Sequence, residues 1–493
     1  MYLKSTARRS IIVLSLTLVA ALCGYFFRIL LAKNFTVAEY GLFYSIFAFL
    51  SLFVTFVDLG FMQAVAKNIV EQRLSNNLEK IKSALMFSSV YQFGVSILLA
   101  MVFVLIIPFF YEKLFHTQNT LIFFLMLIWF VTLPVDMFFK TFFLGFQNVV
   151  AHSSIDPLKV IFVLLLTWMF IHFGFGLLSP FMAYAIVNLI IFILFLFPAH
   201  KAFPTFLFVP FKYDKRLFSH ILSYSVLLAS AGFAWAILTY TDTIMITIFR
   251  NTTEVGLYQV AMPLANTLLY VVGAINVVAY PLFAQFSAKQ ESHHIKSGVT
   301  LLYNYLFIGM LPLALALFSF PELVITLLFG VDYLPATTAL RILSFSALFF
   351  SLASFNTTLL SATGHAKKTA FFAFLTAVLN FILNLALIPL FGFVGASIAT
   401  TASFFFLLIF TLREISTMHS IKLPIKDWTL NFIVAGFVIF IIWAIKAALE
   451  LNPWLELAII GILAAIIYAS LLMLLKVLNI KELRELIFTV LRR

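Results

Sequence analysis

The stretch T-Y-T-D-T-I-M-I-T-I-F-R-N-T-T-E-V-G-L-Y-Q-V-A, residues 239–261, decides how this 493-residue chain is organised. An acid, Asp242, lies inside an apolar run, and a short polar break then leads into the motif E-V-G-L-Y at residues 254–258. Two long apolar runs joined by such a break are typical of consecutive membrane-spanning helices. A charge inside a membrane span is costly, so Asp242 is a candidate functional residue.

A related stretch lies near the N-terminus. Arg28 lies inside an apolar run, a polar break follows, and the motif E-Y-G-L-F-Y closes the stretch at residues 39–44. The motif glycines, Gly41 and Gly256, are 215 residues apart, and each charged residue lies 13 or 14 residues before its glycine. Two corresponding segments thus carry opposite charges at nearly the same depth, which points to the interface between the two halves of a transporter.

Composition indicates the class of protein. The chain is 63% hydrophobic and only 10% charged, and its mean hydropathy is +1.11. A soluble domain of this size would need far more charge on its surface. Apolar runs of roughly 20 residues, the length that spans a bilayer, recur along the whole chain. The sequence therefore predicts an all-α polytopic membrane protein with about 14 transmembrane helices.

The order of elements is repeated once along the chain. G-F-G at residues 174–176 opens the sixth apolar segment, and G-F-V-G at residues 392–395 opens the twelfth, 218 residues later. We expect two six-helix lobes related by this repeat, followed by two extra C-terminal helices. The expected parts are an N-lobe (1–199), a cytoplasmic hinge loop (200–217), a C-lobe (218–413), and the last two helices with a cytoplasmic tail (428–493). Residues 320–330 are expected to form a short helix in the membrane interface.

Basic residues predict the orientation of the chain in the membrane. Of the 31 lysines and arginines, 24 fall in one set of alternate loops and at the termini, and 5 fall in the other set. Lys159 is counted with the richer set. Cytoplasmic loops carry such an excess, so the sequence predicts a cell (inner) membrane protein with both termini in the cytoplasm.

Arg28 and Asp242 each allow two interpretations. The arginine lies near the expected outer end of its helix, where its side chain could reach the headgroups, or it could face an internal cavity and bind phosphate with two nitrogens. Asp242 lies too deep to reach the headgroups. It could pair with Arg28, or it could titrate or bind Na⁺ as a coupling site.

Other polar pairs lie inside the predicted spans. Asp136 and Lys140 are four residues apart and so share one helical face, either as a local ion pair or as part of a cavity. Asn380 and Asn384 have the same spacing and could join helices or contribute to ion coupling. Asp58 is expected in the membrane interface.

Several classes of function are excluded or disfavoured. The phosphate-binding motif G-x-x-x-x-G-K-[ST] does not occur in the sequence, so ATP is not expected to drive the protein directly. Cys23 is the only cysteine, which leaves no intrachain disulfide and no thiolate metal site. We expect no metal, no cofactor and no nucleic-acid partner. The predicted loops are too short for an extracytoplasmic catalytic domain, so an enzyme is not expected.

Three motifs resemble the oligosaccharide (Wzx-type) flippases of the multidrug/oligosaccharidyl-lipid/polysaccharide exporter superfamily. They are A-E-Y-G-L-F-Y at residues 38–44, Asp242 with E-V-G-L-Y, and N-x-x-x-N-x-x-x-I-P-x-x-G-x-x-G-A-S-I-A-T at residues 380–400. The resemblance covers residues 1 to about 415. It implies two six-helix lobes around a central cavity that opens alternately to each side, with the two extra helices of the fourteen-span members.

The resemblance also implies a substrate and partners. The substrate would be a lipid-diphosphate-linked oligosaccharide moved from the inner to the outer leaflet, with H⁺ or Na⁺ as a coupling ion and polysaccharide-assembly proteins as partners. Arg28 matches the basic residue on the first helix of such flippases, and Lys140, Asp242 and Asp136 become candidates for the cavity. A drug/cation antiporter or a lipid II flippase of the same superfamily stays open, whereas a polymerase or ligase would need a long outer loop.

Overall fold

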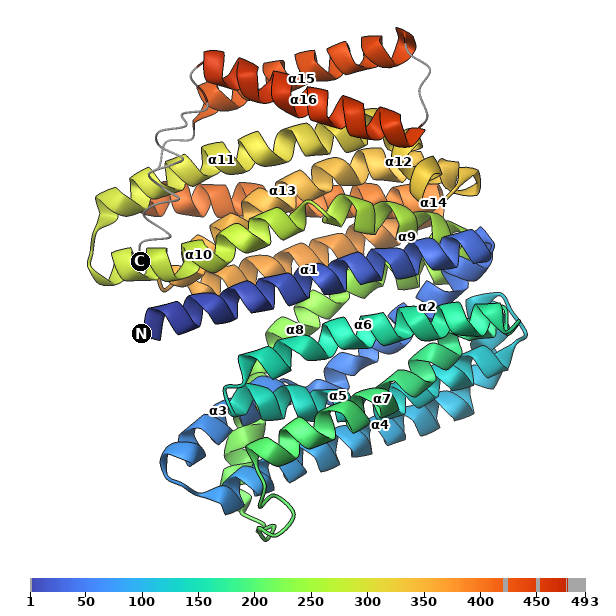
Figure 1. The fold of residues 1–493 in the computed structure, drawn as a ribbon, viewed down its shortest axis with the longest axis vertical. Helices are drawn as coiled ribbons and strands as arrows, with labels where there is room; N and C mark the ends of the chain where they lie inside the picture. The colour runs from blue at the N-terminus through green and yellow to red at the C-terminus, as the bar shows by residue number, and fades with distance from the viewer. Residues whose placement is uncertain (1, 420–423, 449–452, 476, 478–493) are drawn as a thin grey trace. The chain divides into compact units, whose positions relative to one another are not determined.

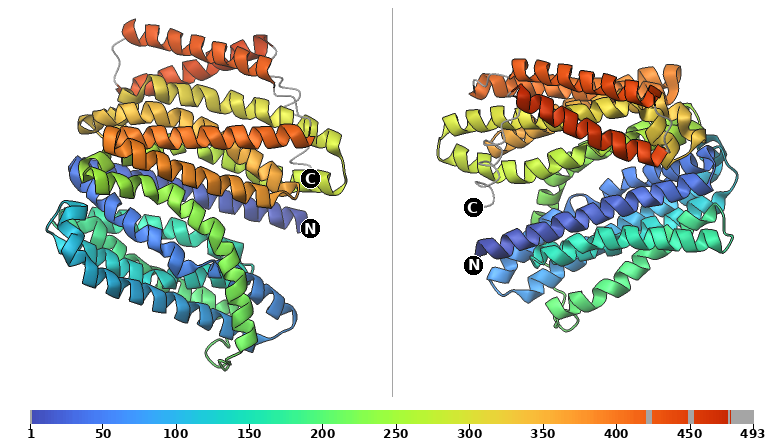
Figure 2. Two further views of the ribbon diagram at one scale, coloured as in Figure 1. Left: turned by 180° about the vertical axis from the view of Figure 1, so that it is seen from behind. Right: turned by 45° about the horizontal axis from the view of Figure 1, so that its top comes forward.

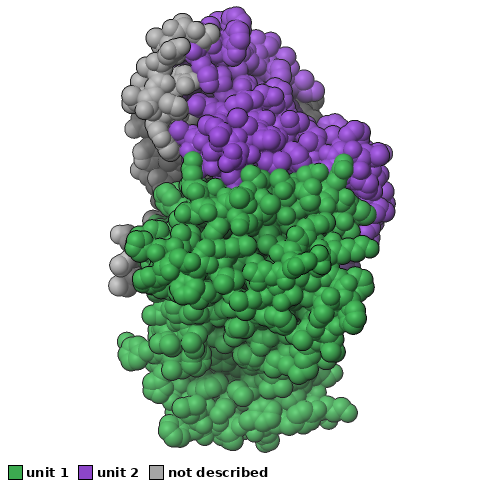
Figure 3. All heavy atoms as spheres, turned by 90° about the vertical axis from the view of Figure 1, so that its right-hand side faces the viewer, with its two compact units in different colours: residues 1–256 green, residues 257–493 purple. Residues whose placement is uncertain are grey.

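The structure, a computed structural model, describes residues 2–419, 424–448, 453–475 and 477, and all regular elements in these ranges are helices. The helices fall into two compact units, residues 1–256 and 257–493, which are coloured separately in Figure 3. Figure 1 labels the helices in chain order. Unit 1 contains α1 (Tyr2–Asn34), α2 (Val37–Asp58), α3 (Phe61–Leu74), α4 (Leu78–Phe115), α5 (Thr120–Gly145), α6 (Val149–His172), α7 (Leu178–Ala202), α8 (Lys215–Phe249) and the start of α9 (Thr252–Asn266).

Unit 2 begins within α9 and has two short elements among its long helices. It contains α10 (Leu269–Ala288), α11 (Ser292–Ser319), α12 (Pro321–Leu328), the 3₁₀ helix η1 (Val331–Ala336), α13 (Thr337–Ala362), α14 (Ala366–His419), α15 (Ile425–Ala448) and α16 (Pro453–Leu474). The short helix expected at residues 320–330 is present as α12. The expected limits of the lobes and of the hinge loop stay predictions; in the structure, residues 203–214 connect α7 to α8.

The predicted fold class is confirmed, although the number of spans depends on how they are divided. Within the described ranges, 12 helices are long and apolar enough to cross a membrane, and a shorter apolar helix covers Gly461–Leu474. One of the 12 covers residues 366–418, where the sequence predicts two separate spans. The chain is therefore a multi-pass α-helical membrane protein, and about 14 is an approximate count of its spans.

The long helix α14 is in fact two helical arms. Gly392 has φ 60° and ψ −139°, a conformation in which a side chain would be strained. The arms run back along each other, because Asn380 on one arm donates to Thr400 on the other (3.3 Å) and Lys368 pairs with Glu414. Figure 2 shows both arms in orange, side by side. The predicted break between residues 390 and 393 is thus a turn at Gly392.

The two motifs found in the sequence build the same helix start twice. At the start of α2, the Thr36 side chain accepts from the backbone N–H of Glu39 (3.3 Å), and the Glu39 carboxylate accepts from the backbone N–H of Thr36 (2.9 Å). At the start of α9, the Asn251 side chain accepts from the backbone N–H of Glu254 (2.9 Å). Caps of this kind satisfy backbone donors that have no partner within the helix. At α2 the glutamate side chain takes part in the cap, and at α9 the backbone N–H of Glu254 does.

The repeated glycine of each motif lies two residues beyond the glutamate, at a close contact between the two motifs. A methyl group added at Gly41 would lie 1.7 Å from the Thr252 carbonyl oxygen and 2.6 Å from the Gly256 nitrogen. One added at Gly256 would lie 2.2 Å from the Val37 carbonyl oxygen. Small residues let helix backbones approach this closely in membranes. Residues 37–41 and 252–256, both in unit 1, are therefore packed backbone against backbone.

The close contact makes a stability prediction. Gly41→Ala should lower the melting temperature of the purified protein, because the new methyl group must push the two helix starts apart, at a cost of about 1–3 kcal/mol. Gly94→Ala in α4 is the matched control, since a methyl group there meets no atom within 4 Å. Melting in one detergent, followed by tryptophan fluorescence, compares the two. Equal stability of both variants would contradict the close contact.

Candidate functional site

Unit 1 contains a polar cavity of about 620 Å³. Most of its charged and aromatic lining comes from five helices: α1, α2, α5, α6 and α8. The sequence predicts each of them as a membrane span, and α7 adds Tyr184. The charged side chains are three basic and three acidic residues: Arg28, Lys140, Lys159, Asp58, Asp136 and Asp156. Six charges in one cavity of such an apolar chain mark it as the candidate functional site.

Helical periodicity explains how the sequence brings these side chains together. On α5 the lining residues are 129, 133, 136 and 140, and on α6 they are 156, 159, 160 and 163. Steps of three and four residues keep side chains on one face of a helix. Each helix therefore turns one partly polar stripe toward the cavity and leaves its other faces apolar.

Asp136 is the centre of an ion cluster that joins α5 to α6. Its carboxylate oxygen Oδ2 accepts from the ammonium groups of Lys140 and Lys159, both at 3.3 Å. Lys140 also pairs with Asp156 at 2.6 Å. The side chain of Asp136 is 7% exposed and that of Lys159 is 13% exposed, whereas that of Asp156 is 63% exposed. The buried part of the cluster holds two positive charges on one carboxylate.

Arg28 lies elsewhere in the same lining, among tyrosines. Its guanidinium carbon is 4.5 Å from the centre of the Tyr44 ring. The Arg28 side chain is also hydrogen-bonded to the Tyr40 hydroxyl. A guanidinium carries five N–H donors, so it can bind more than one acceptor while it lies over an aromatic ring. This position fits the cavity-facing interpretation of Arg28.

Aromatic side chains connect the two groups of cations. Tyr184 contacts Phe43 and Phe47 with ring centres 5.6 Å apart in each case, and it contacts Trp129 at 5.7 Å. Phe43 in turn contacts Tyr44, the ring below Arg28, at 5.0 Å. At the other end, the Lys159 ammonium is 5.9 Å from the Trp129 ring. A chain of aromatic contacts thus runs from Arg28 to Lys159. Phe43 lies behind the cavity surface, and Tyr44, Phe47, Tyr184 and Trp129 form its aromatic wall.

Two buried polar atoms in the wall have no hydrogen-bond partner among the described residues: the indole Nε1–H of Trp129 and Oδ1 of Asp136. One is a donor and the other an acceptor, and both residues line the cavity. Buried polar groups normally find partners in protein, water or ligand. The wall therefore has one donor and one acceptor without a partner beneath its surface.

The structure brings together three of the residues singled out from the sequence. Arg28, Asp136 and Lys140 line one cavity. Asp242 is buried on α8 but is not among the described residues that line the cavity, although its neighbour Tyr240 is.

The asparagine pair lies in unit 2. Asn384 donates to Asn380 (3.1 Å), and Asn380 donates to Thr400 (3.3 Å), so the pair joins the two arms of α14. This arrangement fits helix–helix contact. The role in ion coupling stays a prediction.

Sequence reasoning missed three of the charged lining residues. Lys159 is counted with the cytoplasmic loops, but α6 begins at Val149, which places Lys159 ten residues, or about 15 Å, along the helix. Asp58, expected in the membrane interface, lines the cavity at the break between α2 and α3, where its carboxylate accepts from the backbone N–H of Met62 at 3.2 Å. The spacing of Asp156 and Lys159, three residues apart, is the signal that could have identified α6 as part of the site.

These features, a polytopic helical fold around a charged and aromatic cavity, are those of a membrane transporter. The chain belongs to the polysaccharide biosynthesis protein family, whose model matches residues 7–287. It is 27% identical to an uncharacterised membrane protein of Methanocaldococcus jannaschii over 489 residues, which is 96% of each chain. It is 25% identical over 267 residues to a probable low-salt glycan biosynthesis flippase of Haloferax volcanii, 54% of this chain and 55% of the relative.

Solved structures share the fold. A lipid II flippase in an inward closed conformation matches with a TM-score of 0.74 and 17% identity, over 93% of this chain and 98% of the other. A multidrug transporter of the MOP superfamily, in an inward-facing conformation, matches with a TM-score of 0.63 and 12% identity, over 83% and 94%. The resemblance inferred from the sequence motifs is confirmed for the polysaccharide biosynthesis family, and the chain shares the fold of these two transporters.

The ion cluster makes a prediction about stability. Asp136→Asn should lower the free energy of unfolding by about 3 kcal/mol, because Lys140 and Lys159 lose their shared buried carboxylate. Asp156→Asn removes a partner of the same Lys140, but from an exposed position, and should cost less than about 1 kcal/mol. Adding Lys159→Met to Asp136→Asn should recover part of the loss. Thermal melting of the purified proteins measures all three, and equal effects at positions 136 and 156 would contradict the buried cluster.

Proposed function

We propose that the protein is a flippase that moves a lipid-diphosphate-linked oligosaccharide from the cytoplasmic to the outer leaflet by alternating access. The single observation that carries this proposal is the cavity wall, where cations lie at both ends of an aromatic surface. A diphosphate needs cationic donors, and a sugar crossing the membrane needs polar partners and flat surfaces. The cavity lining offers both kinds of group.

The basic residues of the cavity suit the diphosphate. Arg28 can offer a planar fork to two phosphate oxygens, whereas Lys140 and Lys159 act as point charges. The lining is balanced between three bases and three acids, so an arriving anion must compete with carboxylates for the lysines. Asp136 and Asp156 would then neutralise the lysines in the empty cavity and release them to substrate. We assign Asp242 a similar restraining or ion-coupling role on α8.

The aromatic wall suits the sugar. Trp129 and Tyr184 present ring faces along which the apolar face of a sugar ring can pack. The Nε1–H of Trp129 and Oδ1 of Asp136 lie beneath this wall without partners, and a movement of the wall that exposed them would let one donate to a sugar hydroxyl and the other accept from one. Sugars carry many groups that both donate and accept, so they can satisfy both atoms at once.

The comparisons support the same substrate class. The family is described as one of polysaccharide biosynthesis, and one relative bears the name of a probable flippase of glycan biosynthesis. A drug/cation antiporter with this fold would be expected to present mainly acids to its cavity, and Arg28, Lys140 and Lys159 argue against it. A lipid II flippase would need the same anion chemistry, and only a transport assay with defined substrates separates the two.

The proposed orientation places both chain ends on the cytoplasmic side, in the cell membrane, as the basic loops predict. Asn251, at the exposed start of α9, is then on the outer side, and Ser297 on α11 is on the inner side. A membrane-impermeant thiol reagent should label a cysteine at position 251 in intact cells and should not label one at position 297.

The driving force is proposed to be an ion gradient or the membrane potential, since an anionic substrate responds to the potential directly. An ionophore should therefore abolish transport while ATP is held constant. Asn380, Asn384 and Asp242 are the proposed sites for H⁺ or Na⁺, if an ion is coupled. Undiminished transport in de-energised vesicles supplied with ATP would contradict this part of the proposal.

Arg28 provides the sharpest test of the proposed function. Arg28→Ala should reduce flipping at least about tenfold, the effect of losing a charge-assisted contact of roughly 1.5–3 kcal/mol. Arg28→Lys should restore it only in part, because an ammonium cannot form the planar fork. Asp242→Ala should weaken flipping less than Arg28→Ala. The measurement is the lipid-linked oligosaccharide in each leaflet, or the surface polysaccharide, in a strain that lacks the protein and carries each variant.

Lys33 is the matched control for this series, since it is a basic residue on the same helix with an exposed side chain. Lys33→Ala should flip substrate at the wild-type rate. Membrane levels of all variants must be equal, because a folding defect would imitate loss of transport. Wild-type flipping by Arg28→Ala would mean that the arginine does not bind the diphosphate, and the anion site would then lie at Lys140 and Lys159.

A further inference from the structure

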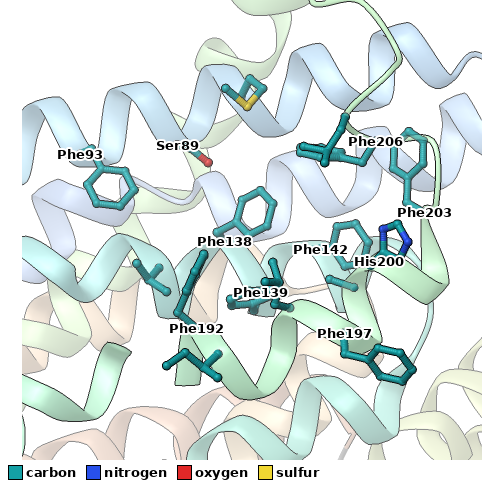
Figure 4. A pocket seen from close by; sticks show the side chains of 16 residues that line it. Ser89, Phe93, Phe138, Phe139, Phe142, Phe192, Phe197, His200, Phe203 and Phe206 are labelled. Carbon is teal, nitrogen blue, oxygen red and sulfur yellow. The ribbon is translucent and has the colours of Figure 1, made fainter. Parts of the chain in front are cut away.

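A second cavity in unit 1, of about 660 Å³, is lined almost entirely by apolar side chains. It lies between α4, α5, α7 and residues 203–214, the connection that follows α7. Figure 4 shows its phenylalanine side chains around a shared space. Ser89 and His200 are its only lining side chains with a polar group. This lining suits a hydrocarbon chain.

The apolar cavity and the polar cavity lie on different faces of the same helix. On α5, residues 135, 138, 139 and 142 line the apolar cavity, whereas residues 129, 133, 136 and 140 line the polar one. Each set follows the three- and four-residue steps of one helical face. An occupant of the apolar cavity is therefore separated by α5 from a substrate in the polar cavity.

The apolar cavity opens toward the outside of the bundle. Phe139 and Phe142 at its floor are 2% exposed, whereas Ile193 and Phe197 on α7 are 63% and 73% exposed. A helix face with such exposed apolar residues is covered by lipid in a membrane protein. The cavity is thus accessible from the surrounding bilayer, and hydrocarbon chains are the occupants present there.

Basic residues lie along the connection that borders the cavity. The Lys82 ammonium donates to the Val209 carbonyl (2.6 Å) and lies 5.2 Å from the centre of the Phe206 ring, so it ties the connection to α4. The backbone N–H of Lys212 donates to the Ser83 hydroxyl (3.1 Å). The start of α4 (residues 79–82) and residues 201–216 together carry more basic than acidic residues. The basic ones are Lys80, Lys82, Lys201, Lys212, Lys215 and Arg216, and the acidic ones are Glu79 and Asp214.

The connection itself has the composition of a segment in the membrane interface. Leu207 and Phe208 are 76% and 85% exposed, and the exposed Phe211 and Tyr213 follow among the lysines. Exposed aromatic residues interleaved with basic ones are typical of chain at the level of the headgroups, where anionic lipids attract lysine and arginine. The cavity mouth therefore lies at a headgroup layer, and the predicted orientation makes that layer the cytoplasmic one.

We propose that the apolar cavity binds a hydrocarbon chain of an anionic bilayer lipid, whose phosphate lies at the basic mouth near Lys201 and Lys212. The apolar floor selects the chain, and the excess of lysine and arginine over acid selects a negative headgroup. The occupant is a resident lipid of the bilayer and not the transported one, because α5 separates this cavity from the polar cavity and because the opening faces the bilayer. The site holds α4, α5, α7 and the connection together around one lipid molecule.

The test uses the purified full-length protein and native mass spectrometry in two lipids of the same chains, dioleoyl-phosphatidylglycerol and dioleoyl-phosphatidylcholine. The wild-type protein should retain phosphatidylglycerol at least fivefold more than phosphatidylcholine. Ser89→Phe fills the cavity from α4, and Ile193→Trp covers it from the exposed face of α7, so each should reduce phosphatidylglycerol retention at least fivefold. Val90→Phe, one position along α4 and 67% exposed to the outside, is the matched control and should retain the lipid as the wild type does.

A double lysine variant tests the contribution of the lipid headgroup. Lys201→Gln with Lys212→Gln should abolish the preference for phosphatidylglycerol, whereas Lys289→Gln with Lys367→Gln, two exposed lysines of unit 2, should leave it unchanged.

Three results would overturn the proposal. The first is that both cavity-filling variants retain phosphatidylglycerol as the wild type does. The second is that the wild type retains the two lipids equally. The third is that a polyprenyl phosphate at equal concentration displaces phosphatidylglycerol, which would identify the transported lipid as the occupant. None of these outcomes depends on transport, so failure here would leave the proposed function untouched.

Discussion

The contact between the backbones of residues 37–41 and 252–256 is the constraint on which the rest of unit 1 depends. It requires glycine at positions 41 and 256, since a single methyl group at either would overlap a backbone atom of the other segment. Nearby, the Thr247 hydroxyl donates to the Ser45 hydroxyl at 3.0 Å, which fixes α8 against α2. In the hydrocarbon of a bilayer the hydrophobic effect does not drive helices together, so close packing and such hydrogen bonds must hold them together. The helices that carry Tyr44 and Tyr240 into the polar cavity are positioned by this contact.

Charge balance is the second organising feature. Three bases and three acids line one cavity within a chain that is only 10% charged. A buried charge is tolerated when an opposite charge and hydrogen bonds accompany it, and Asp136 provides this for two lysines. The same arrangement leaves the lysines available for exchange with an anion. A cavity of uniform positive charge would be costly while empty, and the internal carboxylates remove that cost.

Helix α5 shows how one helix can serve two environments. Its polar stripe, with Asp136 and Lys140, faces the polar cavity, and its phenylalanine stripe faces a cavity open to lipid. Because the two stripes are on different faces, water and hydrocarbon are kept apart by the helix itself. Pro134 is accommodated within α5, beside a region where Asn188 donates to the Trp129 carbonyl (3.2 Å) and to the Thr132 hydroxyl (3.0 Å). Bonds of this kind from a neighbouring helix satisfy backbone groups near a proline in a membrane span.

The sequence by itself determined the class of protein and the approximate number of its spans, and it singled out Arg28, Asp136 and Lys140, which line one cavity. These follow from local properties: the length of apolar runs, the cost of a charge within them, and the spacing that puts side chains on one helical face. Only the tertiary structure decided which charges meet. Lys159 was counted with a loop, Asp58 was expected in the interface, and the aromatic wall of Trp129 and Tyr184 was not foreseen, because each depends on how separate helices pack. The repeated glycines were visible in the sequence. The structure explains them, because the two motifs, whose glycines are 215 positions apart, contact each other at these glycines.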